Sequence, residues 1–265
     1  MKSINTRSKG IFLAACVLSM IVLLLLPTGM LAKDKNVYLN GGIVQTNPEK
    51  KRITLVFTAA DKCDGAVPIM QTLKRHHIKG AFFLTGHFFR LFPDVVQQLV
   101  DEGHYVGSHS YGHLLYFPWG EPNNMSVSQQ EFRDDMDKSY DELGKYGITK
   151  KSNPYFIPPY EHYNQTVSDW AKEMGLQVIN YTSGTASAAD YTTPDMKNYR
   201  SSDSIYTTIM EKEERDGLNG FLLIFHMGTV DARTDKFYNM HLDKLIRTLR
   251  KKGYKFVPLK KAIEK

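Results

Sequence analysis

Cysteine is scarce in this sequence. The 265 residues contain only Cys16 and Cys63, and Cys16 lies within an apolar run near the N-terminus. If that segment is removed, Cys63 has no partner with which to form an intramolecular disulfide. A disulfide-stapled fold is therefore excluded, and a chain of this length can bury a core large enough to be stable without one.

Most of the chain also lacks an excess of charge of one sign. The formal net charge is +6, but Lys2, Arg7 and Lys9 belong to the first 32 residues, which contain no acid. The remaining charge of +3 is dispersed and leaves no electrostatic footprint for nucleic acid. The glycine-rich phosphate-binding motifs of dinucleotide-binding and P-loop proteins do not occur, and nothing indicates a partner protein.

The first 32 residues are organised like an export signal. The three basic residues precede an apolar run over residues 11–26, and residues 27–29, PTG, end it. The run is slightly long for a signal peptide and slightly short for a membrane-spanning helix. We expect cleavage near Ala32 or retention of residues 1–32 as an N-terminal anchor; residues 13–16, LAAC, also resemble a bacterial lipidation site. Each alternative makes the protein extracytoplasmic: periplasmic, secreted or membrane-anchored.

Residues 33–50 are polar and are expected to form an exposed lead-in. From residue 51 onward, short apolar runs alternate with amphipathic stretches. Seven buried strands are predicted, over residues 52–57, 80–85, 104–107, 155–157, 176–181, 220–225 and 254–257. This alternation predicts a parallel sheet covered by helices. We favour an α/β fold, a distorted (β/α) barrel of the TIM type with about seven strands, in a single domain over residues 51–265.

Histidines and carboxylates follow these strands, at the edge where such barrels carry their active sites. His109 and His113 are four residues apart and would share one face of a helical turn, so both imidazoles can bind one metal ion. A nearby carboxylate would complete a hydrolytic metal site. The candidate residues at the strand ends are Asp61, Asp64, His109, His113, Tyr160, Glu161, Thr185 and His226.

These motifs resemble those of the polysaccharide deacetylases, carbohydrate esterase family four. The resemblance covers about residues 50–262 and is carried by residues 80–86 (GAFFLTG), 103–113 (GHYVGSHSYGH), 158–160 (PPY) and 222–226 (LLIFH). It implies metal-dependent removal of N- or O-acetyl groups from sugars on a distorted barrel. In the same resemblance His109 and His113 match two metal-binding histidines. His226 matches the histidine that protonates the leaving group, and Tyr160 matches the tyrosine whose backbone N–H helps to hold the oxyanion.

Two departures from the family pattern concern the catalytic base. The family's first motif, Thr-Phe-Asp-Asp, supplies the base and the third metal ligand, but residues 56–59 here are VFTA. The family's arginine before Pro-Pro-Tyr is replaced by Ile157, and Glu161 follows the tyrosine. This combination resembles a divergent branch of secreted proteins of gut Bacteroidetes, in which a glutamate stands at the position of Asp61.

We therefore expect one divalent ion, zinc foremost with cobalt or nickel as alternatives, bound by His109, His113 and Asp61. Glu161 and Asp64 are the candidates for the base that takes a proton from the attacking water. Asp64 is equally well placed to cap the following helix.

Two further residues are candidates for substrate contact or for orienting the site. Thr185 belongs to a long loop, residues 182–201, beside the expected site. Arg233 follows His226 closely and is a candidate for orienting that histidine, or for an ordinary salt bridge between loops.

The leading hypothesis is a secreted metal-dependent hydrolase that removes N- or O-acetyl groups from a polysaccharide or oligosaccharide, so that its partner is an acetylated glycan. The alternative is a non-catalytic carbohydrate-binding protein on the same barrel that has lost the Asp-Asp motif. A glycosidase with two carboxylates is a weaker hypothesis, because it leaves the histidine pair unexplained.

Overall fold

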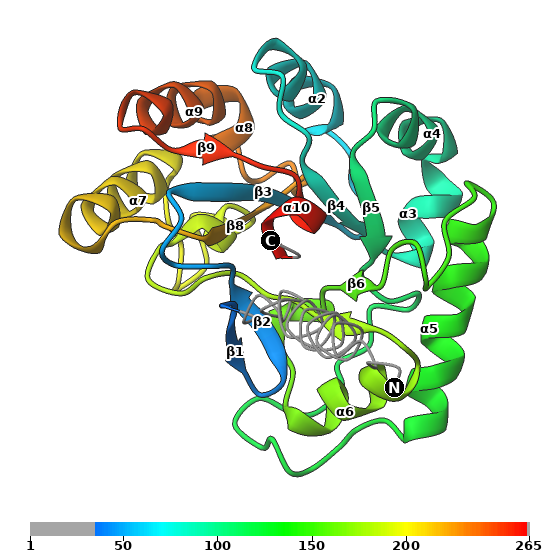
Figure 1. Cartoon of the computed structure of the whole chain (residues 1–265). Helices are drawn as coiled ribbons and strands as arrows, with labels where there is room; N and C mark the ends of the chain where they lie inside the picture. Colours follow the sequence, from blue (N-terminus) through cyan, green and yellow to red (C-terminus); the bar gives the residue numbers. More distant parts are fainter. Residues whose placement is uncertain (1–34, 264–265) are drawn as a thin grey trace, which may run out of the picture. The chain divides into compact units, whose positions relative to one another are not determined.

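The computed structural model describes residues 35–263 (Figure 1). The expected signal or anchor, residues 1–32, lies outside the described residues. Over the described part of the chain, no helix has both the length and the apolar composition needed to cross a bilayer.

Seven strands form one sheet in which every pairing is parallel. Their order is β7-β6-β5-β4-β3-β8, and β9 pairs with the beginning of β3. This confirms the predicted α/β fold and the number of strands. The strands are β3 (Arg52–Ala59), β4 (Ala81–Leu84), β5 (Tyr105–Ser108), β6 (Tyr155–Phe156), β7 (Gln177–Val178), β8 (Phe221–His226) and β9 (Lys255–Phe256).

Most helices connect the strands and lie around the outside of the sheet, whereas α10, which follows the last strand, lies at the centre of the view (Figure 1). Their starts follow local capping chemistry: the Ser128 hydroxyl accepts from the Glu131 N–H, and the Glu131 carboxylate accepts from the Ser128 N–H, so that a capping box begins α5. The short helices α3 and α8 were not predicted from the sequence. The helices are α2 (Ala66–Arg75), α3 (Gly86–Leu91), α4 (Pro93–Asp101), α5 (Gln129–Gly144), α6 (Gln165–Glu173), α7 (Ser202–Asp216), α8 (Phe237–Met240), α9 (Leu242–Lys251) and α10 (Leu259–Ile263).

Hydrogen bonds bring the two ends of the sheet together. After β7, the Thr182 N–H donates to the carbonyl of Leu222 on β8 over 3.1 Å, and the Thr182 hydroxyl donates to the carbonyl of Val44 over 2.6 Å. Val44 belongs to β2 (Gly42–Gln45), which pairs with β1 (Val37–Leu39) in a separate two-stranded sheet. The strands thereby enclose a distorted barrel with β2 beside the closing contact.

The buried hydrophobic residues form two clusters, one on each face of the sheet. Successive side chains of a strand point to opposite faces, so alternate residues share one cluster. The larger cluster packs the strands against the helices. The smaller one fills the interior and includes Leu259 of α10; its members are Ile43, Val56, Ala81, Phe83, Tyr105, Tyr155, Ile157, Ile179, Leu222, Ile224 and Leu259.

The hairpin of β1 and β2 corrects the expectation of an exposed lead-in over residues 33–50. The residues of β1 are exposed, but Ile43 on β2 is 2% exposed and belongs to the interior cluster. No sequence pattern distinguishes Ile43 from the exposed apolar residues Val37 and Leu39 of the same segment. Only the closing of the barrel creates the space that Ile43 fills.

We expect Leu259→Ala to lower the free energy of unfolding by about 2–5 kcal/mol, because it leaves a cavity inside the barrel. Urea denaturation followed by circular dichroism measures the change. Leu91→Ala is the matched control: Leu91 is 57% exposed, and its truncation should change the free energy of unfolding by less than about 0.5 kcal/mol. Equal losses in the two variants would contradict the assignment of Leu259 to the interior core.

Candidate active site

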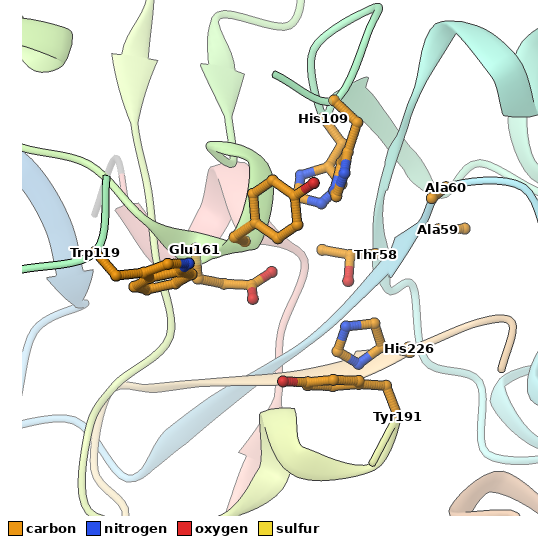
Figure 2. A pocket seen from close by; sticks show the side chains of 10 residues that line it. Thr58, Ala59, Ala60, His109, Trp119, Glu161, Tyr191 and His226 are labelled. Carbon is orange, nitrogen blue, oxygen red and sulfur yellow. The ribbon is translucent and has the colours of Figure 1, made fainter. Parts of the chain in front are cut away.

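The strand residues that face the inside of the barrel continue, beyond its hydrophobic core, to the carboxyl ends of the strands. Two residues beyond Val56 comes Thr58, and two beyond Ile224 comes His226, so both side chains stay on the interior face. A cavity of about 270 Å³ opens there (Figure 2). It is lined by Thr58, Ala59, Ala60, His109, His113, Trp119, Tyr160, Glu161, Tyr191 and His226.

The predicted histidine pair lies in this cavity. The ring centroids of His109 and His113 are 5.0 Å apart. Nδ1 of His109 donates to the carbonyl of Ile157 over 2.9 Å, which leaves Nε2 as the lone-pair nitrogen of the neutral ring. Burial lowers the pKa of His109 to about 3 and that of His113 to about 4. Both imidazoles are therefore neutral near pH 7, the form that binds metal ions.

A buried carboxylate holds the turn that carries this pair. Asp135 of α5 accepts hydrogen bonds from the N–H groups of Tyr111 and Gly112, over 2.9 and 2.7 Å. The next residue, His113, has a left-handed φ of 54°. Its N–H donates to the hydroxyl of Ser110 over 2.9 Å. The direction of the His113 ring thus depends on α5, which is distant in sequence.

The third predicted metal ligand is not in the cavity. Asp61 lies two residues beyond the end of β3, is exposed, and is absent from the lining, where Ala59 and Ala60 stand instead. Its negative charge does act on His113, where it raises the imidazole pKa against the effect of burial. Among residues 35–263, no three His, Cys, Asp or Glu side chains come close enough to hold a metal ion. The two imidazoles fit a metal ion, but a complete set of three donors is not assembled.

A strained turn directs the Glu161 side chain into the cavity. Tyr160 and Glu161 have φ values of 59° and 52°, a conformation that is costly for residues other than glycine. The Asn180 amide donates to the Glu161 carbonyl over 2.7 Å and so ties the turn to the segment after β7. The Glu161 carboxyl group points into the cavity (Figure 2), and its Oε1 is buried with no hydrogen-bond partner in the protein. Burial raises the pKa of this carboxyl group.

His226 is held by a carboxylate that sequence reasoning missed. Nδ1 of His226 lies 2.7 Å from Oδ1 of Asp190, and the His226 backbone N–H donates to Oδ2 over 2.9 Å. Burial by itself would lower the imidazole pKa, but the charge and hydrogen bond of Asp190 raise it above its ordinary value. His226 is therefore suited to carry a proton. Asp190 belongs to the long loop after β7, and no spacing in the sequence links it to His226.

Arg233 makes its hydrogen bonds to this loop and not to His226, although its charge opposes the rise in the His226 pKa. It is fully buried, and its guanidinium donates to the carbonyls of Thr192 and Arg200 and to the Ser202 hydroxyl. It therefore fixes the segment that follows Asp190, and it is not part of the cavity lining.

Two other candidate residues also lie outside the lining. Asp64 accepts from the Thr229 N–H over 2.9 Å and pairs with Lys236 and Tyr238, so it joins the loops after β3 and β8. It makes no capping bond to α2. Thr185 bonds to the Ser187 hydroxyl within its own loop. Strand-end position alone did not predict which of these side chains reach the cavity.

Comparison with known proteins identifies relatives of this chain. The family model for polysaccharide deacetylase matches residues 45–179. A peptidoglycan-N-acetylglucosamine deacetylase of Bacillus cereus is 26% identical over 210 residues, which are 79% of this chain and 67% of the relative. Peptidoglycan-N-acetylmuramic acid deacetylase PdaA of Bacillus subtilis is 30% identical over 134 residues, 50% of this chain and 47% of the relative.

Solved structures share the fold. A peptidoglycan N-acetylglucosamine deacetylase superposes with a TM-score of 0.66 at 24% identity, over 83% of this chain and 92% of its own. A family 4 carbohydrate esterase pseudoenzyme from Bacillus anthracis superposes with a TM-score of 0.65 at 22% identity, over 85% of this chain and 70% of its own.

The contact between Asp190 and His226 predicts a pH-dependent contribution to stability. Because folding raises the His226 pKa, this contribution is complete below the ordinary imidazole pKa of about 6.5 and is lost as the pH rises through the folded value. We expect Asp190→Asn to lower the free energy of unfolding by about 1–3 kcal/mol near pH 5.5 and by less near pH 9.

Urea denaturation at the two pH values measures this difference. The control is Asp203→Asn. Asp203 carries an exposed carboxylate outside the cavity, and its Oδ1 lies 2.7 Å from Nε2 of His241. This substitution should have a smaller effect at both pH values. A loss in Asp190→Asn that does not depend on pH would contradict the charged pair.

Proposed function

We propose, on the premise that the chain belongs to the polysaccharide deacetylase family, that it hydrolyses acetyl groups on a polysaccharide or oligosaccharide. One observation carries the proposal: the Glu161 carboxyl group and His226, whose imidazole is held by Asp190, line one cavity. These groups can take up and deliver the protons that acyl hydrolysis requires. The acetyl group can be an amide on a sugar nitrogen or an ester on a sugar oxygen.

In this proposal Glu161 is the general base. It takes a proton from the water whose oxygen attacks the acetyl carbonyl carbon, and the carbonyl electron pair moves onto oxygen. The backbone N–H of Tyr160 is the proposed donor to that oxyanion. Because burial raises the Glu161 pKa, its carboxylate is a stronger base than an exposed one.

His226 is the proposed general acid. As the bond between the acetyl carbon and the sugar nitrogen or oxygen breaks, protonated His226 delivers a proton to the leaving atom, and acetic acid is released. The proton held by Glu161 then returns to His226 through water, which restores both groups. Asp190 favours the protonated imidazole and fixes the orientation of the ring.

We also propose a divalent ion at the histidine pair, zinc foremost, with cobalt or nickel as alternatives. His109 and His113 would supply nitrogen ligands, and Asp61, which lies outside the cavity, does not complete the set in this structure. When bound, such an ion polarises a carbonyl and lowers the pKa of water.

The residue types at the end of β3 favour a second function. Thr58 and Ala59 line the cavity where the family motif has two aspartates, and the Thr58 hydroxyl is buried without a partner. Among the similar structures is a mutant of the Bacillus anthracis pseudoenzyme described as having restored activity. The alternative is therefore a protein that binds a glycan in this cavity without hydrolysing it.

The proposed site of action is outside the cytoplasm. The basic start and apolar run within residues 1–32 support export or anchoring, and several of the similar curated proteins are named as deacetylases of peptidoglycan. The proposed partner is accordingly an acetylated glycan of a cell surface.

We expect Glu161→Gln to lower kcat for acetate release by roughly 10²–10⁴, the usual contribution of general base catalysis, with the fold unchanged. Asp64→Asn is the control, because it alters a carboxylate outside the cavity; its kcat should stay near that of the wild type. Acetate release is measured on chitin oligomers, peptidoglycan and acetylated xylan. The opposite result, in which Asp64→Asn is inactive and Glu161→Gln is close to the wild type, would identify Asp64 as the base. Wild-type protein that binds one of these glycans without releasing acetate would favour the alternative function.

The proposed metal site is tested by elemental analysis of purified protein, which should contain close to one divalent ion per chain. His113→Asn should lose the ion. His77→Asn should keep it, and it is a matched control because His77 is exposed and also has a left-handed φ, 51° against 54°. Asparagine tolerates this conformation, so both substitutions remove an imidazole at similar backbone cost. Wild-type protein that is free of metal and still releases acetate would refute the metal proposal.

A further inference from the structure

Lysines gather at one end of the barrel. Because every pairing in the seven-stranded sheet is parallel, the segments that lead into its strands share the amino end of the barrel. Together with the segment that carries β9 and α10, they contain ten lysines and two acidic residues, and we call them the basic end. They are residues 46–51, 76–80, 102–104, 145–154, 174–176, 217–220 and 252–263.

The opposite end of the barrel has the opposite balance of charge. The segments that follow the strands and surround the cavity contain five lysines and arginines and eight acidic residues. They are residues 60–65, 85, 109–128, 157–164, 179–201 and 227–236. An anionic surface would therefore attract the basic end and repel the end that holds the cavity.

Most lysines of the basic end keep their charge exposed. Within residues 35–263, only Lys145, Lys150 and Lys252 of this set form ion pairs with acidic side chains. Six others are exposed and form no ion pair with a described residue: Lys50, Lys51, Lys79, Lys151, Lys255 and Lys261. Like charges on one face repel one another, and an anionic partner would relieve this repulsion.

An exposed apolar strand adjoins the basic end. Val37, Tyr38 and Leu39, the three residues of β1, are all exposed. Just before them, the side-chain amide of Asn36 donates to the carbonyl of Ile263, at the end of α10, over 3.1 Å. Apolar and aromatic side chains beside a basic surface are the combination that binds at the interface of an anionic membrane.

The course of the chain favours a lipid surface over other anionic partners. The apolar run that we expect to serve as an export signal or anchor ends at residue 26, and β1 begins eleven residues later. Eleven residues span at most about 40 Å. A retained anchor would therefore tether β1 to the bilayer.

We propose that the basic end and β1 form a docking surface for a bilayer that contains anionic phospholipids. The cavity lies at the other end of the barrel, so in this orientation it opens away from the membrane. A glycan would then reach the cavity from the side that faces away from the lipid. The inference does not depend on the proposed hydrolysis, because no lysine and no residue of β1 lines the cavity.

Co-sedimentation with vesicles tests this docking on the chain that begins at Lys33, the expected product of cleavage near Ala32. Both buried clusters lie within residues 35–263, and residues 35–265 form a compact unit, so this chain retains its core. It should bind vesicles of phosphatidylcholine with phosphatidylglycerol and not vesicles of phosphatidylcholine alone. Binding should fall sharply in about 1 M salt, where the Debye length is about 3 Å.

Two triple variants with the same net charge test which lysines bind the lipid. The first replaces exposed lysines of the basic end: Lys151→Gln, Lys255→Gln and Lys261→Gln. The control replaces exposed lysines outside it: Lys62→Gln, Lys138→Gln and Lys197→Gln. The first should weaken binding to the anionic vesicles by roughly 10², because each lysine near such a surface contributes about fivefold. The control should bind almost as tightly as the unchanged protein, and equal losses in the two would overturn the basic end as the docking surface.

The contribution of β1 is tested by Leu39→Ser. This substitution should weaken binding to the anionic vesicles, because less apolar area would be buried in the lipid. Leu91→Ser is the matched control, since Leu91 on α3 is 57% exposed and Leu39 is 58% exposed. It should leave binding unchanged. Equal binding by the two variants would remove β1 from the docking surface.

Quenching by brominated phospholipids measures the orientation on the vesicle. The chain contains two tryptophans, Trp119 at the cavity and Trp170 on α6. In a Trp170→Phe protein, brominated anionic vesicles should leave the emission of Trp119 unchanged. In a protein that combines Tyr38→Trp with Trp119→Phe and Trp170→Phe, they should quench the emission. Quenching of Trp119 would show that the cavity faces the lipid and would overturn the proposed orientation.

The outcomes separate this inference from the proposed hydrolysis. Binding to anionic vesicles by a protein that releases no acetate would keep the docking surface and reject the hydrolase. Acetate release by a protein that does not bind these vesicles at low salt would keep the hydrolase and overturn the docking surface. Binding to linear polyphosphate or DNA, without binding to the vesicles, would overturn a lipid surface as the partner.

Discussion

The alternation of side chains along parallel strands is the constraint on which this structure depends. In β3 and β8, one residue in two faces the interior of the barrel, and the same rows continue to Thr58 and His226 at the cavity. A shift of one residue in register would turn both side chains toward the helices and place apolar residues at the cavity. The packing of the core and the composition of the candidate site are therefore fixed together.

Contacts between loops fix the orientation of side chains that the strands bring to the cavity. Asp190 holds His226 by two hydrogen bonds, and the buried guanidinium of Arg233 holds the loop that carries Asp190. Asp64 joins the loops after β3 and β8 in a comparable way. Asp190 and Arg233 lie outside the cavity lining, yet both limit where His226 can point. Substitutions there are expected to alter the site through geometry rather than through lost contact with a ligand.

The carboxyl group of the cavity has a different origin from that of the family motif. The end of β3 carries Thr58 and Ala59, whereas Glu161 enters from the turn after β6. Two consecutive left-handed residues would not persist in this turn unless surrounding bonds, such as that from Asn180 to the Glu161 carbonyl, compensated for their cost. This turn also places Tyr160 beside His113 and Trp119. One strained segment thus supplies both the candidate base and an aromatic ring of the cavity lining.

The sequence by itself determined the strand and helix alternation, because apolar periodicity reports secondary structure. Local motifs at the strand ends indicated the family and the histidines of the cavity. It predicted His109, His113 and His226 as site residues, and all three line the cavity. Only the tertiary structure decided the directions of side chains in loops. Asp61 and Glu161 both follow strands, but Asp61 faces solvent and Glu161 faces the cavity. Likewise, the pairing of Asp190 with His226 and the burial of Ile43 have no local signature. Such directions depend on hydrogen bonds and closing contacts between segments that are distant in the chain, and no local pattern of residues encodes them.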